Sequence, residues 1–443
     1  MVIQPNEPLL KQVEEVIRPL DVRNKKLLMA FSGGVDSRVL LECLAKLKNT
    51  LHFKLLAMHV HHGLSQNADQ WADFCQTTCN ALDVPIEIVH VTINRAAGIG
   101  IEAVARQARY EALANASADL IVLAHHKDDQ AETFLLQLMR GAGVKGLSAM
   151  ASHDDSRRLV RPFLDTDRSA IEAFAKKHEL TWIEDESNSD ARFDRNFLRH
   201  QIIPTLQERY PSLNNVLARS ASHMAEASQL LDELAEIDAK ACLLGKQLKL
   251  EALASLSDTR ARNLLRWWLA SNQQPLPNTQ RLQEMLRQLI TAKSDSLIRV
   301  AVDVSEKVYL RRYKDLAYID RDTESETISF VWNGEPELAL PDGSVLKFEK
   351  GIGSGLAYSR LGIQKLRISQ RVGGERFKPY PNKPTRTVKH LLQEANIPPW
   401  LRNRVPMIYF DDKLAMIPGI GEAYDLQAGE KEDGLEISWF CQE

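Results

Sequence analysis

Short apolar runs alternate with helical patterns along the first 200 residues of the chain. Each apolar run is too short for a helix and ends in polar or turn-forming residues, so it predicts a strand. The predicted strands are 26–31, 54–60, 86–91 and 120–124. Apolar residues at helical spacing predict a helix around 39–47 and helices over 68–82, 101–116 and 128–139. This alternation is typical of an α/β fold with a doubly wound parallel sheet, covered by helices on both faces.

The pattern changes after about residue 200. Residues 196–250 are mostly helical, and the absence of glycine and proline between 214 and 244 predicts a long linker helix. Helical character continues to about 289, turns strand-like over 294–320, and gives way to a glycine-rich stretch at 343–355. We therefore predict three domains: an N-terminal α/β domain (1–218), a linker helix with a helical middle domain (219–325) and a small α/β C-terminal domain (326–443).

The composition is that of an ordinary soluble protein. Of the 443 residues, 44% are apolar and 26% charged, and no apolar run approaches the ~18 residues of a membrane span. The five cysteines are scattered, which predicts free thiols and a cytoplasmic location, and the acidic N-terminal stretch does not resemble a signal peptide. The net charge of −3 does not favour nucleic-acid binding by the whole chain, so any basic footprint must be local.

A glycine pair follows the first predicted strand, in the segment Ser32-Gly33-Gly34-Val35-Asp36-Ser37. Glycine lets a phosphate approach the backbone closely, and N–H groups at a free helix N-terminus, together with the two hydroxyls, can cradle an anion. Asp36 stands where a carboxylate can hold Mg²⁺ against the phosphates. The segment is not a Walker A loop, because the Gly-Lys-Ser/Thr ending is absent. A plain strand-to-helix turn is the alternative, but six specified positions favour nucleotide binding.

Polar residues also follow the second and fourth predicted strands. His125 opens a helical segment in which Asp129 and Glu132 lie three residues apart on one face. Two carboxylates there can capture an ammonium group or a metal, and helix capping is the alternative. His59 belongs either to a turn at the edge of the core or to an adenosine pocket.

Arginines occur on two further predicted helices. Arg106 and Arg109 share a face, where they can clamp phosphates or form a surface ladder of ion pairs. An acidic turn at 184–188 leads into a basic helix, for which a capped helix with solvated charges is the alternative. The arginines of this helix are Arg192, Arg195 and Arg199.

The motifs together resemble those of the bacterial tRNA(Ile)-lysidine synthetases, members of the N-type ATP pyrophosphatases. In order between about 26 and 200, they are SGGxDS, HVxHGL, ARxxRY, HHxDDQAET, RGxGxxGLSAM, RPxL, WIEDxSN and DRNFLR. The segments 376–379 and 389–402 resemble the C-terminal tRNA-binding domain of that family. The middle of the chain, about 240–360, matches only by position and helical character.

The resemblance implies an enzyme that converts the wobble cytidine of the isoleucine tRNA with a CAU anticodon to lysidine. ATP would adenylate the C2 carbonyl oxygen with release of pyrophosphate, and the side-chain amine of L-lysine would then displace AMP. Mg²⁺ would accompany ATP. The first domain is then a Rossmann-like ATP pyrophosphatase domain, and the last is a tRNA-binding domain.

The resemblance also assigns residues to these roles. Those implied for ATP are Ser32, Gly33, Gly34, Val35, Asp36, Ser37, His59 and His125, with Asp36 on Mg²⁺. The implied catalytic residues are Asp36, Arg106, Arg109, Asp129 and Glu132. Lysine would be bound by Asp129, Glu132 and the weaker candidate Asp185. The residues implied for tRNA are Arg192, Arg195, Arg199, Arg376, Lys378, Lys389 and Arg402.

The C-terminal part is basic on its own arithmetic. Between residues 365 and 404 there are ten lysines and arginines and two glutamates, a local balance of +8. Phosphate backbones dominate the affinity of proteins for nucleic acid and need such a patch. Trp400, which follows two prolines, is either a rigid corner of the core or a base-stacking platform.

Two other functions compete with this interpretation. A tRNA thiolase of the same superfamily needs a reactive or cluster-binding cysteine, whereas Cys75 and Cys79 are spaced four apart in a predicted helix. A nucleotide-dependent RNA-binding protein without turnover is disfavoured by the intact carboxylates. Oligomeric state does not follow from the sequence, and a homodimer stays an open alternative.

Overall fold

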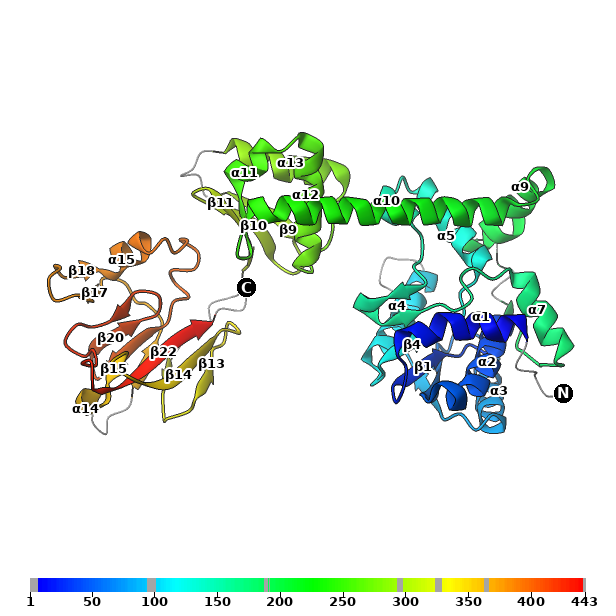
Figure 1. The fold of residues 1–443 in the computed structure, drawn as a ribbon, viewed down its shortest axis with the longest axis horizontal. Coiled ribbons are helices and arrows are strands. Elements are labelled where there is room, and N and C mark those ends of the chain that lie inside the picture. Colours follow the sequence, from blue (N-terminus) through cyan, green and yellow to red (C-terminus); the bar gives the residue numbers. More distant parts are fainter. Residues whose placement is uncertain are drawn as a thin grey trace. The chain divides into compact units, whose positions relative to one another are not determined.

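The computed structural model describes residues 7–93, 101–186, 190, 192–292, 298–322, 329–361 and 366–440. The chain divides into two units, residues 1–231 and 232–443, and the division falls within helix α10 (Leu213–Cys242). Figure 1 shows α10 in green as one long helix. The long helix predicted in this part of the chain is thereby confirmed.

The first unit is built on a six-stranded sheet in the order β3-β2-β1-β4-β6-β5. Neighbouring strands run parallel except for β5, which is antiparallel to β6. The strands are β1 (Lys26–Ala30), β2 (Lys54–His61), β3 (Ile86–His90), β4 (Leu120–Val122), β5 (His153–Asp154) and β6 (Leu159–Val160). The four strands predicted from apolar runs are confirmed, whereas β5 and β6 have two residues each and leave no such run.

Helices connect these strands and extend the unit beyond them. They are α1 (Pro8–Ile17), α2 (Val35–Leu51), α3 (Ala68–Ala81), α4 (Ile101–Asn115), α5 (Lys127–Met139), α6 (Val144–Leu147), α7 (Arg168–Lys177), α8 (Asp194–Phe197) and α9 (Ile203–Arg209). A π-helical segment, Leu198–Ile202, joins α8 to α9. The four helices predicted between and after the strands are confirmed.

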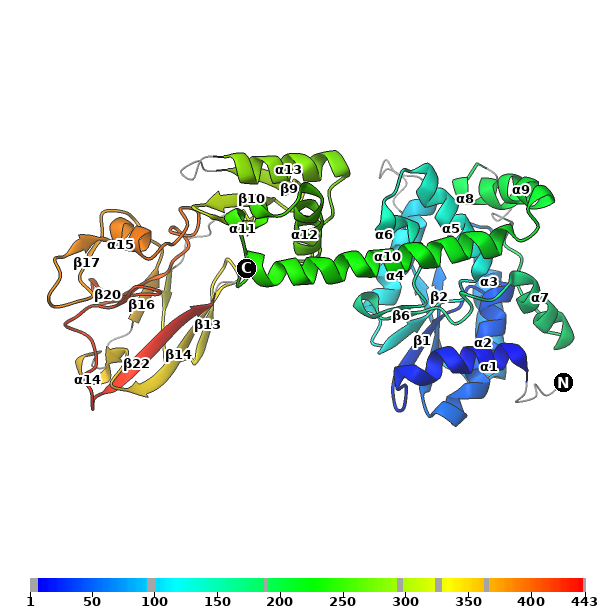
Figure 2. The same ribbon diagram turned by 45° about the horizontal axis from the view of Figure 1, so that its top comes forward.

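The sheet is buried on both faces because successive side chains of a strand point to opposite sides. Leu27 and Met29 of β1 pack in one core with residues of α1, α2 and α7. Leu28, between them, packs in a second core with Leu113 of α4. Figure 2 shows these helices around the strands. The doubly wound fold is therefore confirmed.

The strand order places a switch point between β1 and β4. From β1 the chain builds outward through β2 and β3, and it then returns to the other side of β1 to form β4. Ligands of open α/β sheets bind beyond the carboxyl ends of the strands at such a point, where the connections diverge. The segments after β1 and β4 are 31–34 and 123–126, so this topology brings the glycine pair and the two histidines together.

The second unit begins with the end of α10, three helices and an antiparallel sheet. The helices are α11 (Leu250–Ser255), α12 (Asp258–Ser271) and α13 (Thr279–Thr291). The sheet has the order β7-β8-β11-β10-β9, with β7 (Leu243–Leu244), β8 (Gln247–Lys249), β9 (Arg299–Asp303), β10 (Val308–Tyr313) and β11 (Leu316–Arg321). Helices and sheet share one core, in which Trp268 is buried. The helical middle is confirmed, and the strand-like stretch after it forms most of this sheet.

The remainder of the second unit packs antiparallel strands around another core. One sheet has the order β12-β16-β19-β20-β21, with β12 (Ser329–Val331), β16 (Leu366–Ser369), β19 (Met407–Phe410), β20 (Lys413–Ile417) and β21 (Gly421–Glu422). The other has the order β13-β14-β22-β15, with β13 (Glu337–Ala339), β14 (Val345–Ile352), β15 (Leu356–Ala357) and β22 (Asp433–Phe440). A small hairpin of β17 (Arg376–Phe377) and β18 (Arg386–Thr387), with the short helices α14 (Tyr358–Leu361) and α15 (Val388–Glu394), completes it.

Across the described parts of both units, no helix combines the length and the apolar character that crossing a membrane requires.

Candidate active site

The loop between β1 and α2 is shaped by Gly33. Its φ of +86° is a conformation that residues with a side chain rarely adopt, and an added Cβ would lie 2.4 Å from Cδ1 of Ile183. The carbonyl of Gly33 also accepts a hydrogen bond of 2.9 Å from the backbone N–H of Ile183. Glycine is thus required at this position by the fold itself.

Gly34, by contrast, has open space beside its Cα atom, and a side chain there would not disturb the fold. Gly34 is the N-cap residue of α2, and no side chain caps this helix. A Cβ added at Gly34 would lie 3.6 Å from Oγ of Ser32, an ordinary contact. Oγ of Ser32 and Oγ of Ser37 are 3.0 Å apart beside it. Uncapped N–H groups, two hydroxyls and free space form an arrangement that suits a phosphate.

Asp36, in the first turn of α2, contacts His126, which lies in the segment after β4. Nε2 of His126 lies 3.7 Å from Oδ2 of Asp36 and 3.4 Å from Oδ2 of Asp129. Burial lowers the pKa of His126, but its contact with Asp36 and the negative charges of Asp129 and Asp36 outweigh burial, so the net pKa is raised. The imidazole of His126 therefore joins the phosphate loop to the first turn of α5.

The other oxygen of the Asp36 carboxylate is buried and finds no hydrogen-bond partner among the described residues. Such an orphaned acceptor is costly unless a ligand completes it. The described residues contain no group of three or more histidines, cysteines and acids that could hold a metal ion. Mg²⁺ in nucleotide enzymes is held by one or two carboxylates together with phosphates and water, so a single carboxylate at this position fits it.

Asp129 and Glu132 are engaged by two arginines that come from the segment after α7. Nη2 and Nε of Arg195 lie 2.7 Å from Oδ1 of Asp129 and 2.6 Å from Oε2 of Glu132. Nη2 and Nε of Arg199 lie 3.2 Å from Oδ1 of Asp129 and 2.6 Å from Oε1 of Glu132. Two carboxylates spaced three apart on α5 thus match two guanidiniums spaced four apart along α8 and the π-helical segment.

This four-residue cluster is largely removed from water. Glu132 is 1% exposed and Asp129 is 8% exposed. Burial favours the neutral form of Asp129, but the charges of His126 and Arg195 outweigh burial and hold its pKa well below the usual range. Asp129 also accepts a 2.9 Å hydrogen bond from the backbone N–H of His126, so it caps α5 at the same time. The sequence does not reveal these ion pairs.

His125 lies next to the cluster in a positive environment. Burial is the main cause that lowers its pKa to about 3, and the charges of Arg195, Arg161 and Arg106 lower it further while Asp129 opposes them. Arg161 directly follows β6 and is 5% exposed. We did not single it out from the sequence, although a buried arginine at the carboxyl edge of the sheet suits a polyanionic ligand. His125 is neutral at physiological pH.

His59 lies beneath the phosphate loop rather than on its open side. The ring is 6% exposed, and its Nδ1 is 3.0 Å from the carbonyl oxygen of Phe31 and 3.4 Å from Sγ of Cys75. Burial is the main cause that lowers the pKa of His59. These contacts support the backbone that enters the loop.

Arg109 and Asp185 belong to a second neighbourhood, around His62. Burial, then the charge of Arg109, lowers the pKa of His62 to about 4, whereas the charge of Asp185 acts in the opposite sense. Arg106 lies on the same helix with its guanidinium carbon 5.1 Å from the centre of the Tyr110 ring. Of the three residues expected to bind lysine, Asp129 and Glu132 lie in the arginine cluster, and the charge of Asp185 acts on His62.

Comparison with known proteins adds the family. A PP-loop domain model matches residues 5–206, a TilS substrate binding domain model matches 248–318, and a TilS substrate C-terminal domain model matches 366–439. A tRNA(Ile)-lysidine synthase from Nitrosomonas europaea is 43% identical over 96% of this chain and 93% of its own length. The chain belongs to the tRNA(Ile)-lysidine synthase family.

Two further relatives carry the same name. The protein from Azoarcus is 40% identical over 94% of this chain and 91% of its own length, and that from Coxiella burnetii is 38% identical over 94% and 92%. The resemblance stated from the motifs is thereby confirmed. So is its choice of a lysidine synthase, an ATP-dependent ligase, over a thiolase.

The cysteines agree with a lysidine synthase and not with a thiolase. Cys75 and Cys79 on α3 are fully buried, and burial is the main cause that raises the pKa of each to about 12. The described cysteines are Cys43, Cys75, Cys79 and Cys242, all buried with free thiols, and Cys441 lies outside the described residues. A thiolate nucleophile needs the opposite environment, exposed and electropositive.

The three arginines of the N-terminal domain that are expected to bind tRNA differ in their surroundings. Arg192 is exposed and pairs with Asp190 at 2.6 Å. Arg195 and Arg199 are the partners of Asp129 and Glu132 described above. Only Arg192 therefore presents most of its side chain to solvent in the structure.

In the C-terminal domain, two residues of the basic stretch are used inside the unit. Arg402 donates to the carbonyl of Ile397 at 2.8 Å and to the hydroxyl of Tyr313 at 3.2 Å. Arg404 pairs with the buried Asp320 at 3.1 Å. Trp400 lies between the rings of Tyr313 and Tyr318, with centroid distances of 6.3 and 5.6 Å. These contacts join the C-terminal domain to β10 and β11, and they favour the corner role of Trp400 over base stacking.

Proposed function

We propose that the chain ligates lysine to C2 of the wobble cytidine of the CAU-anticodon isoleucine tRNA. The reaction would pass through an adenylated tRNA and release pyrophosphate and AMP. The observation that carries this proposal is that a phosphate loop and a buried carboxylate pair lie together at one switch point of the sheet, connected by His126. Family membership supplies the reaction class, and the names of the relatives supply the tRNA.

The first step would be attack of the C2 carbonyl oxygen on the α-phosphorus of ATP. A new oxygen–phosphorus bond forms, and the bond to the pyrophosphate oxygen breaks. Backbone N–H groups in the first turn of α2 are available to the phosphates, with the hydroxyls of Ser32 and Ser37 beside them. Arg106 and Arg109 are our candidates for the α-phosphate, because α4 carries them on one face.

Mg²⁺ would be held by Asp36, whose buried oxygen has no partner among the described residues. When bound, the ion would neutralise charge on the phosphates. His126 would keep the Asp36 carboxylate oriented by its contact with the other oxygen. Val35 contributes its backbone to the start of α2, and His59 supports the loop from below.

The second step would be attack of the lysine ε-amine on C2, with departure of AMP and loss of one amine proton. Asp129, Glu132 and Asp185 are our candidates for holding the lysine. Because Arg195 and Arg199 now engage the first two, an ammonium group can reach them only if a guanidinium moves aside.

The tRNA would be bound by basic residues of both units. We propose Arg192, Arg195 and Arg199 near the catalytic site and Arg376, Lys378, Lys389 and Arg402 in the C-terminal domain. The local balance of +8 between residues 365 and 404 supports the second group. A cytoplasmic location and a homodimer also stay predictions, the first supported by the free thiols and by the tRNA substrate.

Mass spectrometry of the isoleucine tRNA tests the proposal. The tRNA is incubated with the full chain, ATP, Mg²⁺ and L-lysine, and the wobble nucleoside should gain one lysine less one water. Omitting lysine should leave adenylation and pyrophosphate release but no lysidine. An unchanged nucleoside, or a sulfur-containing product when a sulfur donor is supplied, would contradict the assignment.

A further inference from the structure

The basic stretch of the C-terminal domain divides into inward and outward residues. Four arginines are held by partners within the unit. They are Arg371 with Glu375, Arg386 with Glu394, Arg402 with Tyr313, and Arg404 with Asp320. The described acids form no ion pair with Lys378, Lys383 or Lys389, which lie between residues 376 and 389. Lys365 lies outside the described residues. Three of the basic residues without an acidic partner therefore lie between β17 and the start of α15.

Two of these lysines lie over exposed tyrosine rings. Nζ of Lys378 is 4.6 Å from the centre of the Tyr424 ring, and Nζ of Lys383 is 4.7 Å from that of Tyr380. Tyr380 is 50% exposed and Tyr424 is 42% exposed, which is unusual for aromatic side chains in a folded domain. Each pair offers an amine and an aromatic face side by side.

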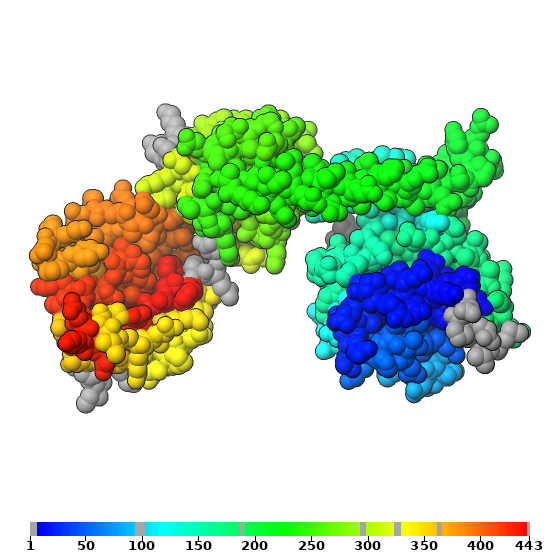
Figure 3. All heavy atoms as spheres, in the orientation of Figure 1, coloured from blue at the N-terminus to red at the C-terminus, as the bar shows by residue number. Residues whose placement is uncertain are grey.

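The loop that carries the pairs is fixed by hydrogen bonds. The backbone N–H of Tyr424 donates to the carbonyl of Lys378 at 3.1 Å, and the side chain of Gln427 donates to the carbonyl of Pro379 at 2.9 Å. Across the loop, Arg376 donates to the carbonyl of Thr385 at 3.3 Å. In Figure 3 the orange part of the chain, which includes this loop, lies on the visible surface. The backbone that carries the two pairs is therefore fixed by hydrogen bonds within the domain.

We propose that Lys378, Tyr380, Lys383 and Tyr424, here called the lysine–tyrosine surface, bind unpaired nucleotides of the tRNA. The rings would stack on exposed bases, and the amines would contact the adjoining phosphates. Proteins recognise single-stranded RNA by this combination, whereas paired bases do not present their faces. The inference rests on the proposed tRNA substrate, and it assigns to this surface a mode of binding that charge alone would not predict.

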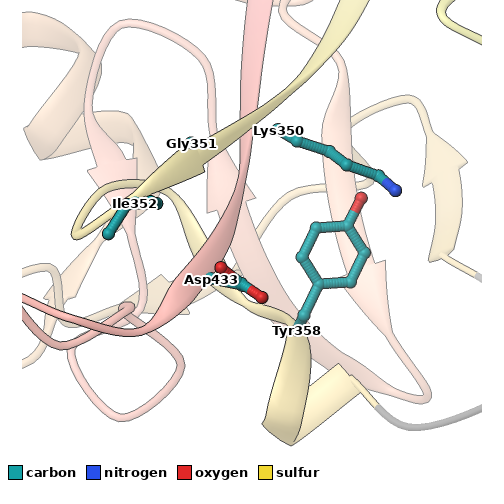
Figure 4. Close-up of a pocket in the computed structure, with 5 residues that line it drawn as sticks. All are labelled: Lys350, Gly351, Ile352, Tyr358 and Asp433. Atoms are coloured by element: carbon teal, nitrogen blue, oxygen red, sulfur yellow. The ribbon is translucent and has the colours of Figure 1, made fainter.

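Two other lysine–aromatic pairs of the domain lack this character. Nζ of Lys350 lies 5.7 Å from the centre of the Tyr358 ring, and Figure 4 shows Asp433 in the same pocket, where its carboxylate would repel a phosphate. Nζ of Lys347 lies 5.6 Å from the centre of the Phe440 ring but pairs with Glu337 at 2.6 Å. Phe440 is 52% exposed, so it is a matched control for Tyr380 and Tyr424.

The test measures binding of the full chain to the isoleucine tRNA at several salt concentrations. The variants are Tyr380→Ala, Tyr424→Ala, the double variant, the two Tyr→Phe variants, Lys378→Ala, Lys383→Ala and the control Phe440→Ala. A single-stranded oligoribonucleotide and an RNA duplex of equal length serve as competitors. Thermal unfolding of each variant monitors the fold.

We expect the double Tyr→Ala variant to raise Kd about tenfold or more, because it removes both aromatic rings on which bases would stack. Its salt slope should not change, because no charge is lost. Each Lys→Ala variant should instead reduce the log–log salt slope by about one unit. Tyr→Phe variants and Phe440→Ala should bind within about twofold of the original chain. The single strand should outcompete the duplex against the original chain but not against the double variant.

Several outcomes would overturn the inference. Unchanged affinity in the double Tyr→Ala variant would do so, and so would equal losses in Phe440→Ala or in the Tyr→Phe variants. Lysidine formation by the original chain is measured in parallel. If lysidine forms while the tyrosine variants bind normally, the inference alone fails. If no lysidine forms but the tyrosines still govern RNA binding, the proposed function alone fails.

Discussion

The two halves of the candidate site differ in how far the protein satisfies its own polar groups. In the phosphate loop, α2 has no side-chain cap, and one oxygen of Asp36 has no partner among the described residues. In the carboxylate half, both oxygens of Glu132 are engaged by Arg195 and Arg199, within 2.6 Å of one nitrogen each. The phosphate loop, here called the open half, therefore has polar groups that a ligand can satisfy. The cluster of Asp129, Glu132, Arg195 and Arg199, here called the complete half, satisfies its own polar groups.

The difference indicates an order of events. Groups left unsatisfied in the folded state are preorganised for an anion, so nucleotide binding needs no prior rearrangement. A buried carboxylate that already pairs with a guanidinium can accept a new cation only by exchange. Under the proposed lysine assignment, binding of the amine substrate would thus be coupled to movement of an arginine, whereas binding of ATP would not.

Asp36→Ala should produce the largest loss of activity, because it removes the carboxylate of the open half. Adenylation should fall by about 10²–10³-fold, the usual cost of losing one preorganised electrostatic group. Thermal unfolding should be nearly unchanged, because one of the two removed oxygens has no partner among the described residues. Pyrophosphate release in the presence of tRNA and ATP measures the effect. Normal release would show that Asp36 does not serve the phosphates.

Glu132→Gln and Asp129→Asn perturb the complete half. We expect the apparent KM for lysine to rise at least about tenfold, since losing a charge-assisted hydrogen bond costs ~1.5–3 kcal/mol. Stability should fall as well, because Arg195 and Arg199 lose a charged partner. Adenylation should survive better than lysine incorporation.

Measuring both half-reactions in the same variant separates the explanations. Equal losses of pyrophosphate exchange and lysine incorporation would mean that the carboxylates do not select lysine. A loss of stability with an unchanged KM for lysine would leave them with a purely structural role. An Asp185→Asn variant, compared directly, should identify the lysine contact if the pair proves structural.

Replacing each glycine of the loop by alanine separates the glycine that the fold requires from the glycine that leaves space for a ligand. Gly33→Ala should cost about 1–2 kcal/mol or more, because alanine is strained at φ +86° and its methyl group would collide with Ile183. Gly34→Ala should keep its stability, since its methyl group meets nothing closer than 3.6 Å. ATP binding by the folded Gly34→Ala protein should nevertheless weaken. Equal stability losses in both variants would refute this division.

The smallest effect concerns pH. In the folded protein the pKa of His62 is about 4, below the ordinary value of about 6.5, so the unfolded chain takes up a proton first as pH falls. The contribution of neutral His62 to stability is therefore present above pH ~6.5 and decreases toward pH ~4. His62→Gln should flatten the fall in the unfolding midpoint across this window. His223→Gln, at an exposed position on α10, is the control and should change nothing.

The sequence predicts the open half well because its signals are local. A buried strand, two glycines and an acid within six residues define the loop, and apolar runs define β1 and β4 whose adjacency creates the site. Helix α1 was not predicted, although Leu9, Leu10, Val13 and Ile17 form its buried face. We use this segment of the sequence only as evidence against a signal peptide. That evidence is its acidic residues and not the spacing of its apolar residues.

The complete half could not be predicted, because its partners are far apart in the chain. Asp129 and Glu132 have a local spacing that indicates a cation site, and Arg195 and Arg199 have one that indicates an anion site. Nothing in either spacing reveals that the two sites satisfy each other. His126 is absent from the predicted site residues for a similar reason, because its significance lies in a contact with Asp36, on another element.

The distance along the chain between Glu132 and Arg199 has a consequence during protein synthesis. The two residues are 67 positions apart, and the phosphate loop precedes both. At about 5–20 residues per second, Glu132 leaves the ribosome roughly 3–13 s before the arginine that pairs with it. During that interval Asp129 and Glu132, which are buried in the folded protein, have no guanidinium to pair with. The first unit can therefore reach its final electrostatic state only after translation has passed α8 and the π-helical segment.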